Sequence, residues 1–263
     1  MNILDTIIEY KKSEVKNRKA EISVAELQKS EFFRRKILSM KKALFDESKT
    51  GIIAEFKRRS PSKGVINENA DIGKVVSAYA RNGASGLSVL TDSTFFGGCA
   101  QDLETARLNQ VPILRKDFII DEYQVTETRA MGADVILLIA ACLDPAEVKN
   151  LAGLARSMQL EVLLEIHNEI ELDHICDEID LVGVNNRDLK TFEVDIDRSI
   201  ALAKRIPADK IKITESGISS IENIFRFREN GFKGFLIGEY FMKQPDPATA
   251  FAEFIKQLKA KAT

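Results

Sequence analysis

The stretch GIIAEFKRRSPSKG, residues 51–64, joins the pattern of a buried strand to a cluster of charged residues. Its apolar run reaches Ala54 and is followed at once by Glu55, Lys57 and Arg59. An unpaired charge is costly to remove from water. A strand that ends in this way therefore either reaches a solvated rim or contributes to a site for a charged ligand, and the rest of the chain decides between the two.

Seven more strand-length apolar runs follow, several of them rich in Val and Ile. They are GLSVLTD (86–92), VPILRKD (111–117), DVILLIA (134–140), EVLLEI (161–166), LVGVNN (181–186), KIKITES (210–216) and GFLIGEY (234–240). Between these runs lie helical patterns with Ser or Asp at the start and Gly at the stop, such as those ending at Gly83, Gly132 and Gly231. The pattern after Asp144 begins with Pro145, and a last helix is expected over residues 246–261.

This alternation of strands and helices predicts a parallel sheet with right-handed crossovers. Eight units fit a closed (β/α)8 TIM barrel, which typically has about 250 residues. An open doubly wound sheet is the alternative, but no Gly-rich turn follows the first strand. We predict a single TIM-barrel domain over residues 1–263, with the barrel in 49–263. Helical patterns at 3–15 and 23–44 predict an N-terminal helical extension over 1–48.

The global composition points to no macromolecular partner. The 38 basic and 40 acidic residues give a formal net charge of −2, so any cationic site must be local. The longest apolar run, VILLIAACL (135–143), is too short to span a bilayer, and the first ten residues carry acidic groups and no basic leader. Three scattered cysteines fit reduced thiols. We expect a cytoplasmic monomer without nucleic-acid or membrane partners.

Strand ends in this chain repeat one design. Side chains alternate between the two faces of a strand, so residues two apart share a face. In five strands, the residue nearer the carboxyl end of such a same-face set is polar. The sets are Ile53 with Glu55 and Lys57, Leu114 with Lys116, Leu163 with Glu165, Asn185 with Arg187, and Ile213 with Glu215. One such charge is usually the start of a loop, but five favour a site at the carboxyl-end rim of the barrel.

The predicted rim combines cationic and carboxylate side chains. It carries four cations and three carboxylates, which are Lys57, Arg59, Lys116 and Arg187, and Glu55, Glu165 and Glu215. Such a set suits a substrate with more than one anionic group and supplies acid–base capacity with displaced pKa values. After the seventh and eighth strands, Ser216, Gly217 and Gly238 leave backbone N–H groups accessible, where this fold usually binds phosphate.

A metal site is not expected. His167, His174 and Cys176 are spaced H-x6-H-x-C, which matches no common zinc arrangement. Surface positions or satisfied buried groups are the more ordinary interpretation of these residues.

Seven segments resemble one known family, indole-3-glycerol-phosphate synthase of tryptophan biosynthesis. The segments are IIAEFKRRSPSKG, SVLTDSTFFGG, ILRKDFIIDEYQV, LLEIHN, VGVNNRDL, ITESGI and FLIGEYFM. The resemblance implies a lyase that closes the ring of 1-(2-carboxyphenylamino)-1-deoxyribulose 5-phosphate with loss of CO₂ and water, giving indole-3-glycerol phosphate. Such a reaction needs no electron-sink cofactor, because decarboxylation restores the aromatic ring, so we expect no cofactor and no metal.

The resemblance also implies roles for individual residues. Lys116 would be the general acid, Glu165 its partner in proton transfer, and Lys57 a cation near the substrate carboxylate that lowers the pKa of Lys116. The remaining catalytic positions are Glu55, which would orient the lysines, and Asn185 and Glu215, which would bind hydroxyl groups. The substrate-binding positions are Ser60, Arg59, Arg187, Phe95, Phe118, Leu137, Ser216, Gly217, Gly238 and Glu239. An aromatic lid from the extension would use Phe32 or Phe33.

Two other functions stay open on the sequence alone. Another phosphosugar enzyme on this barrel, such as an isomerase, would share the phosphate segments. A non-catalytic barrel that binds a phosphometabolite would share them as well. The segments KRRSPSKG and LRKDF argue against the first alternative, and the presence of both Lys116 and Glu165 argues against the second.

Overall fold

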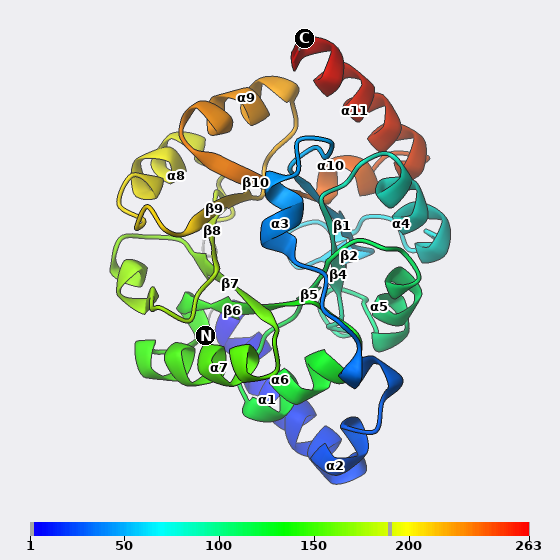
Figure 1. Ribbon diagram of the computed structural model, residues 1–263, viewed down its shortest axis with the longest axis vertical. Helices are drawn as coiled ribbons and strands as arrows, with labels where there is room; N and C mark the ends of the chain where they lie inside the picture. The colour runs from blue at the N-terminus through cyan, green and yellow to red at the C-terminus, as the bar shows by residue number, and fades with distance from the viewer. Residues whose placement is uncertain (1–2, 189–190, 263) are drawn as a thin grey trace.

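The eight apolar runs form the eight strands of a closed parallel barrel in the computed structural model, which describes residues 3–188 and 191–262 (Figure 1). The strands are β1 (Ile52–Phe56), β4 (Gly86–Leu90), β5 (Ile113–Lys116), β6 (Val135–Ile139), β7 (Glu161–Ile166), β8 (Leu181–Asn185), β9 (Ile211–Glu215) and β10 (Phe232–Ile237). They pair in chain order, and β10 closes the ring against β1. The predicted barrel is confirmed, and the open-sheet alternative is wrong.

Strand alternation divides the core into two parts. One set of buried side chains, including Ile53, Leu114, Leu163 and Ile213, fills the inside of the barrel. The other set faces the surrounding helices. On each of these strands, the apolar residue that faces the barrel interior lies deeper than the polar residue on the same face. The polar strand ends therefore meet at the carboxyl end of the barrel.

Helices surround the barrel and begin at the expected caps. They are α4 (Ile72–Arg81), α5 (Ala100–Arg107), α6 (Glu122–Ala130), α7 (Pro145–Ser157), α8 (Ile196–Ala203), α9 (Ile221–Glu229), α10 (Glu239–Met242) and α11 (Pro247–Ala262). The Asp144 side chain accepts a hydrogen bond from the Glu147 N–H at the start of α7, and Glu147 returns one in a capping box. Shorter elements are the hairpin β2 (Arg59–Ser60) and β3 (Gly64–Val65), and the 3-10 turns η2 (Ala140–Cys142) and η3 (Ile170–His174).

The N-terminal extension consists of α1 (Ile3–Glu21), α2 (Val24–Leu27), η1 (Glu31–Arg34) and α3 (Met40–Phe45). The predicted helical extension is confirmed, and the helical pattern over 23–44 is divided into three short helices. Arg35 Nη2 donates to Gly132 O and Asp134 Oδ1, both at 2.6 Å, and the Leu38 N–H donates to Asp134 Oδ1 at 2.7 Å. These contacts with the barrel hold the chain out of the helix and outweigh its local helical pattern.

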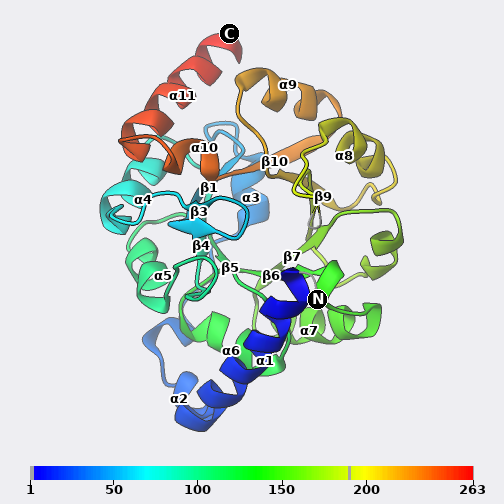
Figure 2. The same ribbon diagram turned by 180° about the vertical axis from the view of Figure 1, so that it is seen from behind.

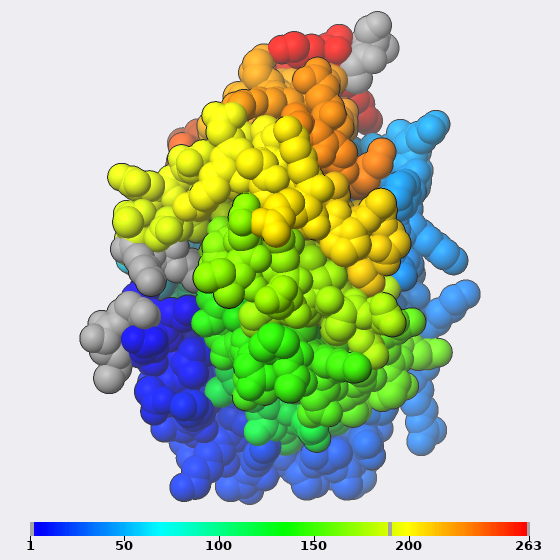
Figure 3. All heavy atoms as spheres, turned by 90° about the vertical axis from the view of Figure 1, so that its left-hand side faces the viewer, coloured from blue at the N-terminus to red at the C-terminus, as the bar shows by residue number. Residues whose placement is uncertain are grey.

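The extension reaches both ends of the barrel. Helix α1 crosses the carboxyl end, which faces the viewer in Figure 2, whereas α3 covers the amino end, which faces the viewer in Figure 1. In Figure 3 the dark blue atoms of α1 and the lighter blue atoms of the later extension lie on opposite sides of the green barrel segments. Met40 and Leu44 of α3 join the cluster inside the barrel and close it from below.

Helix α6 is buried on every side because the extension covers its outer face, through contacts with α1, α2 and η1. Several of its polar residues have buried partners. Glu127 accepts from Arg18 of α1 and from Arg115 of β5, each at 2.7 Å, and Thr128 accepts from Arg115 at 3.1 Å. Buried polar groups with such partners tie the extension to the barrel in one geometry. No described helix is long and apolar enough to cross a membrane.

Gly98 allows the loop between β4 and α5 to press against the barrel, since a Cβ added there would collide with the backbone carbonyl of Leu90. We expect Gly98→Ala to lower the free energy of unfolding by about 1–3 kcal/mol, because the backbone must shift to make room. Urea unfolding measures this change. Gly153→Ala in α7 is the control, because nothing lies within 4 Å of the added Cβ, and it should stabilise by about 0.5–1 kcal/mol. Equal stabilities for the two variants would contradict the close contact.

Candidate active site

A pocket opens at the carboxyl end of the barrel and is lined by most of the predicted site residues. These are Glu55, Lys57, Ser60, Lys116, Phe118, Leu137, Glu165, Asn185, Arg187, Glu215, Ser216, Gly217, Gly238 and Glu239. They come from seven strands of the barrel or from the loops that follow them, which are far apart in the sequence. The structure thus brings Lys57, Lys116 and Glu165 together in one pocket.

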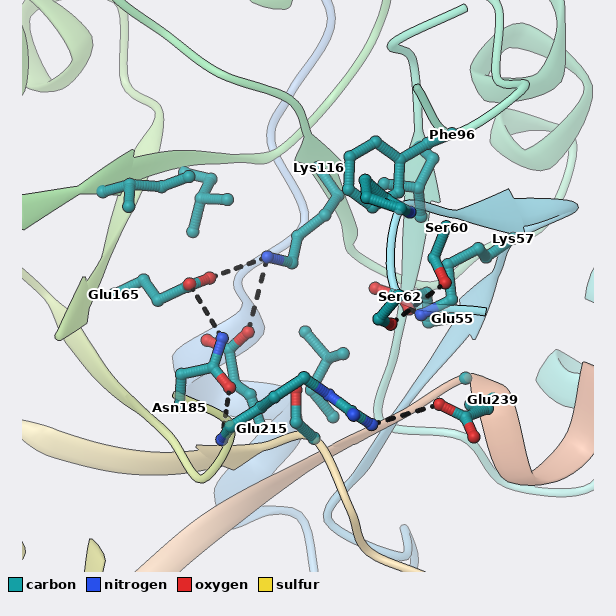
Figure 4. A pocket seen from close by; sticks show the side chains of 18 of the residues that line it. Glu55, Lys57, Ser60, Ser62, Phe96, Lys116, Glu165, Asn185, Glu215 and Glu239 are labelled. Carbon is teal, nitrogen blue, oxygen red and sulfur yellow. Dashed lines mark hydrogen bonds and ion pairs between the residues drawn. The ribbon is translucent and has the colours of Figure 1, made fainter. Parts of the chain in front are cut away.

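Lys116 lies at the centre of a hydrogen-bonded cluster (Figure 4). Its Nζ donates to Glu165 Oε2 at 2.7 Å and lies 3.5 Å from Glu215 Oε2. The other oxygen of Glu165 accepts from Asn185 Nδ2 at 2.9 Å. The ammonium is only 17% exposed, so these charge-assisted contacts act in a weakly screened environment.

Lys57 forms a second ion pair on the other side of the pocket (Figure 4). Its Nζ lies 2.7 Å from Glu55 Oε1, and Ser88 Oγ donates to the other oxygen of Glu55 at 3.3 Å. Glycine at 238 makes room for this carboxylate, because an added Cβ would lie 2.5 Å from Glu55 Oε1. Glu55 therefore orients Lys57 directly, as predicted for one of the two lysines.

The prediction that Lys57 lowers the pKa of Lys116 is wrong. Burial alone would lower the pKa of the Lys116 ammonium, but the carboxylates of Glu165, Glu215 and Glu55 raise it well above the ordinary value. Lys57 is paired with Glu55, which offsets its positive charge. Lys116 is therefore held as a cation in the unliganded pocket.

The two carboxyl groups beside Lys116, those of Glu165 and Glu215, have pKa values shifted in opposite directions. Burial raises the pKa of Glu215 to about 8; Lys116 opposes this shift, whereas Glu165 and Glu55 add to it. The pKa of Glu165 is lowered in spite of burial, because Lys116 and His167 lie against it. Like charges in one site push such pKa values apart. At neutral pH the pocket thus holds an ionised Glu165 as a base and a protonated Glu215.

Gly183 on β8 accommodates Glu215 in this cluster. A Cβ at position 183 would collide with Glu215 Oε1. Glycine in a strand interior often marks such a close approach.

The loops after β9 and β10 form the second part of the pocket. Ser216 and Gly217 both have a φ of 69°, so the chain turns sharply after β9 in a conformation that favours glycine. Arg187 closes this side of the mouth. Its Nη2 lies 3.2 Å from Glu239 Oε2, and its Nη1 donates to Phe192 O at 3.2 Å. A cation and backbone N–H groups near a turn suit an anionic substrate group.

Two predicted binding residues lie outside the pocket lining. Arg59 belongs to the β2–β3 hairpin and its side chain is exposed beside Gly97. The Phe95 ring packs edge-on against Tyr10 at 5.7 Å between centroids, whereas Phe96 lines the pocket with its ring 6.0 Å from that of Phe118. Adjacent residues in a loop face different ways, and the sequence FF gave no signal of which one faces inward.

The lid prediction of Phe32 or Phe33 is wrong. Both belong to η1, and Phe32 packs at Gly132, near the amino end of β6. Instead α1 covers the pocket with Ile3, Leu4 and Ile7. Their helical spacing was the available signal, since it places three apolar groups on one face. Other lining residues that the sequence reasoning missed are Pro61, Ser62, Leu90, Asp92, Phe96, Asp117, Ile139, Phe192, Ile218, Leu236, Ile237 and Tyr240.

A fully buried lysine fixes α1 over the pocket. Lys11 Nζ lies 2.9 Å from Asp92 Oδ2 after β4 and 3.0 Å from Asp117 Oδ1 after β5. Asp92 also accepts from the N–H of Phe96 at 3.2 Å, and Asp117 from that of Phe118 at 2.8 Å. One ammonium group thus connects the helix to both loops that carry the aromatic wall.

Comparison with known proteins identifies the family of this chain. The sequence profile described as indole-3-glycerol phosphate synthase matches residues 4–254. The chain belongs to the indole-3-glycerol phosphate synthase family. A protein of that name from Bacteroides thetaiotaomicron is 49% identical and covers 98% of this chain and 99% of its own length. One from Polaromonas sp. (strain JS666) is 44% identical over 96% of this chain and 97% of its own.

The family is the one that the sequence motifs indicated. Among solved structures, the tryptophan synthase alpha subunit of Legionella pneumophila has a TM-score of 0.61 at 13% identity and covers 84% of this chain and 97% of its own. At this identity the likeness supports the barrel fold alone. Within the described residues, no group of three or more His, Cys, Asp or Glu side chains has the arrangement of a metal site.

Lys11→Met should destabilise the protein strongly, because Asp92 would stay buried without its cation and Asp117 would keep only Arg115. The expected loss in the free energy of unfolding is about 3–5 kcal/mol, measured by thermal or urea denaturation. Lys12→Met is the control, since Lys12 is exposed and pairs only with Glu9 on the same helix, and it should change stability by less than about 0.5 kcal/mol. A Lys11→Met protein as stable as the control would show that α1 is held by other contacts.

Glu215→Gln should become more stable relative to the native chain as pH rises toward 8. The folded pKa of Glu215, about 8, exceeds the value of about 4.3 expected in the unfolded chain. Its contribution to stability is therefore complete below about pH 4.3 and is lost as pH rises toward 8. Glutamine imitates the neutral carboxyl and has no such loss.

Glu165→Gln should show the opposite dependence of stability on pH. The pKa of Glu165 is lowered on folding, so its contribution is present at neutral pH and is lost as pH falls below about 4.3. Urea unfolding near pH 3, near pH 5 and near pH 8 measures both variants, since the loss expected for Glu165 falls below about pH 4.3. Parallel behaviour of the two variants across this range would contradict the assignment of one neutral and one ionised carboxyl group.

Proposed function

We propose how this pocket carries out the reaction that family membership gives the chain, the synthesis of indole-3-glycerol phosphate by a carboxy-lyase. The substrate, 1-(2-carboxyphenylamino)-1-deoxyribulose 5-phosphate, has an aryl ring, a carboxylate and a phosphate. Apolar lining from Phe96, Phe118 and Leu137 suits the ring. The turn at Ser216 and Gly217, with the N–H groups after Gly238, suits the phosphate.

Lys116 acts as the general acid in ring closure. Attack of the aryl carbon on the ketone develops negative charge on the ketone oxygen, and the Lys116 ammonium faces the pocket where this oxygen would lie. CO₂ then leaves from the aryl carbon that made the attack, and the ring becomes aromatic again. Substrate that displaces the Lys116 ammonium from Glu165 and Glu215 removes the contacts that raise its pKa, which makes it a stronger acid.

Glu165 acts as the base in the dehydration that follows. The hydroxyl group leaves as water with a proton from a lysine, while Glu165 removes a proton from the closing five-membered ring. Its lowered pKa keeps it ionised for this task. Lys57 lies across the pocket, beside Glu55, and can hold the substrate carboxylate before CO₂ departs. Asn185 and Glu215 bind hydroxyl groups of the sugar-derived chain.

The observation that carries this proposal is the Lys116 ammonium bound between Glu165 and Glu215 inside the pocket. A barrel that only binds phosphometabolites has no need for a buried acid and base side by side. An aldose–ketose isomerase would have no use for an apolar wall built for an aryl ring.

Three further features remain proposals. We propose that the chain acts as a monomer, that it is a single domain with residues 1–48 as its extension, and that it works in the cytoplasm on a small-molecule substrate. The three cysteines are free thiols, which supports a reducing compartment. The packing of Met40 and Leu44 of α3 into the cluster inside the barrel supports a single domain.

Lys116→Ala should lower kcat by about 10²–10⁴-fold, because the developing alkoxide loses its proton donor, while KM changes far less. Indole fluorescence of the product, followed with a chelator present, measures both constants. Lys74→Ala is the control, since Lys74 is exposed on α4, and it should behave like the native chain. No fluorescence gain by the native chain at saturating substrate would reject the function. Near-normal turnover by Lys116→Ala would reject only the acid role of Lys116.

A further inference from the structure

A carboxylate lies at the end of the pocket where an anion is expected to bind. Glu239 follows Gly238 at the start of α10 and lines the pocket together with Ser216 and Gly217. Its Oε2 lies 3.2 Å from Arg187 Nη2, and a dashed line at Glu239 in Figure 4 marks this contact. An anion site ordinarily gathers cations and N–H groups, and a carboxylate among them competes with the ligand. The Glu239 side chain therefore opposes the binding of any anion at Arg187.

Arg187 is held in place by its own loop. Its Nη1 donates to Phe192 O at 3.2 Å, its N–H donates to Asn185 Oδ1 at 3.0 Å, and its backbone pairs with that of Val194. The side chain is only 17% exposed. Contacts that do not involve Glu239 thus direct Nη2 at the mouth of the pocket. The guanidinium stays in position for another acceptor when the Glu239 carboxylate moves away.

The Glu239 carboxylate has a second cation within reach. Its Oε1 lies 4.0 Å from Lys63 Nζ, in the turn between β2 and β3. The Lys63 side chain is 51% exposed and that of Glu239 is 33% exposed, so both side chains have room to turn at the rim. Lys63 and Arg187 belong to loops after two different strands of the barrel. One carboxylate can thus exchange a shielded cation for an exposed one.

We propose that Glu239 is a specificity residue that occupies Arg187 until an oxyanion of the substrate displaces it, an inference that rests on the proposed function. On displacement, an ion pair between Arg187 and the substrate replaces the one with Glu239, and the freed carboxylate moves toward Lys63. The oxyanion is the phosphate or the aryl carboxylate of the substrate, since both accept from a guanidinium in the same way.

An internal competitor of this kind discriminates between small anions and the whole substrate. Free inorganic phosphate must break the Arg187–Glu239 pair to bind and gains little else, so its apparent affinity is lowered. The substrate also places an aryl ring against Phe96 and Phe118 and has a second anionic group. This additional binding energy offsets the displacement of Glu239. The pocket is thereby kept free of unrelated anions, which is specificity by an element that repels the wrong ligand.

The test measures competitive inhibition of the indole-fluorescence assay by inorganic phosphate and, separately, by benzoate, at constant ionic strength. In Glu239→Gln the inhibition constant of at least one of these anions should fall about three- to tenfold, because the anion no longer has to break an ion pair. KM for the substrate should fall as well. A fall confined to phosphate assigns Arg187 to the substrate phosphate, and a fall confined to benzoate assigns it to the substrate carboxylate.

Further variants separate the charge of Glu239 from its packing. Glu239→Asp keeps the carboxylate, so its inhibition constants should stay within about twofold of the native values. In an Arg187→Met background, the gain from Glu239→Gln should shrink to less than about twofold, since the two residues act as a pair. Glu253→Gln is the matched control, because Glu253 is exposed on α11 and does not line the pocket. It should leave the inhibition constants and KM unchanged.

Equal or weaker binding of both anions by Glu239→Gln would overturn the proposal, because Glu239 would then only hold Arg187 in place. A gain that persists in full without Arg187 would overturn it as well. Thermal denaturation with and without phosphate or benzoate measures binding to the folded chain in the absence of turnover. A native chain that forms no indole product would reject the proposed function, whereas this binding comparison would still decide the role of Glu239, so the two failures are distinguishable.

Discussion

The structure depends on one constraint, which is that the Lys116 ammonium and the carboxyl groups around it must share a buried pocket. A lone charge at this depth would be expelled or neutralised. Glu165 and Glu215 keep Lys116 charged, and Lys116 keeps Glu165 ionised, while Glu215 holds a proton. The arrangement fixes which of these groups are charged and which is neutral at neutral pH. It also requires glycine at 183, since a side chain there would displace Glu215.

Buried ion pairs also hold the N-terminal extension against the barrel. Lys11 of α1 pairs with Asp92 and Asp117, so a second buried ammonium contacts the residue that follows Lys116. Asp117 also binds Arg115 at 3.0 Å, and Arg115 binds Glu127 of α6. Charges on the outer side of β5 and just after it thus fix the helix that covers the pocket, while Lys116 on its inner side faces the pocket. The alternation of a single strand separates the two tasks.

Much of this could be predicted from sequence, because the signals are local. Alternating apolar residues marked the strands, Asp and Ser caps marked helix starts, and the polar members of five strand ends met in one pocket as their shared faces required. Predictions failed where contacts between residues far apart in the sequence determine the local structure or the pKa. The segment around Arg35 has a helical pattern, but Asp134, some hundred residues away, binds it as extended chain. The pKa of Lys116 depends on distances to three carboxylates, and no spacing in the sequence gives them.

Helix α3 has a consequence for how the molecule assembles. Because Met40 and Leu44 complete the interior packing from below, the amino end of the barrel interior stays uncovered until α3 is in place. Contacts of this kind join the start of the chain to strands throughout it, which raises the contact order and slows folding. The extension and the ring should therefore melt as one cooperative unit, with amide hydrogen exchange in α3 as slow as that in the strands it plugs.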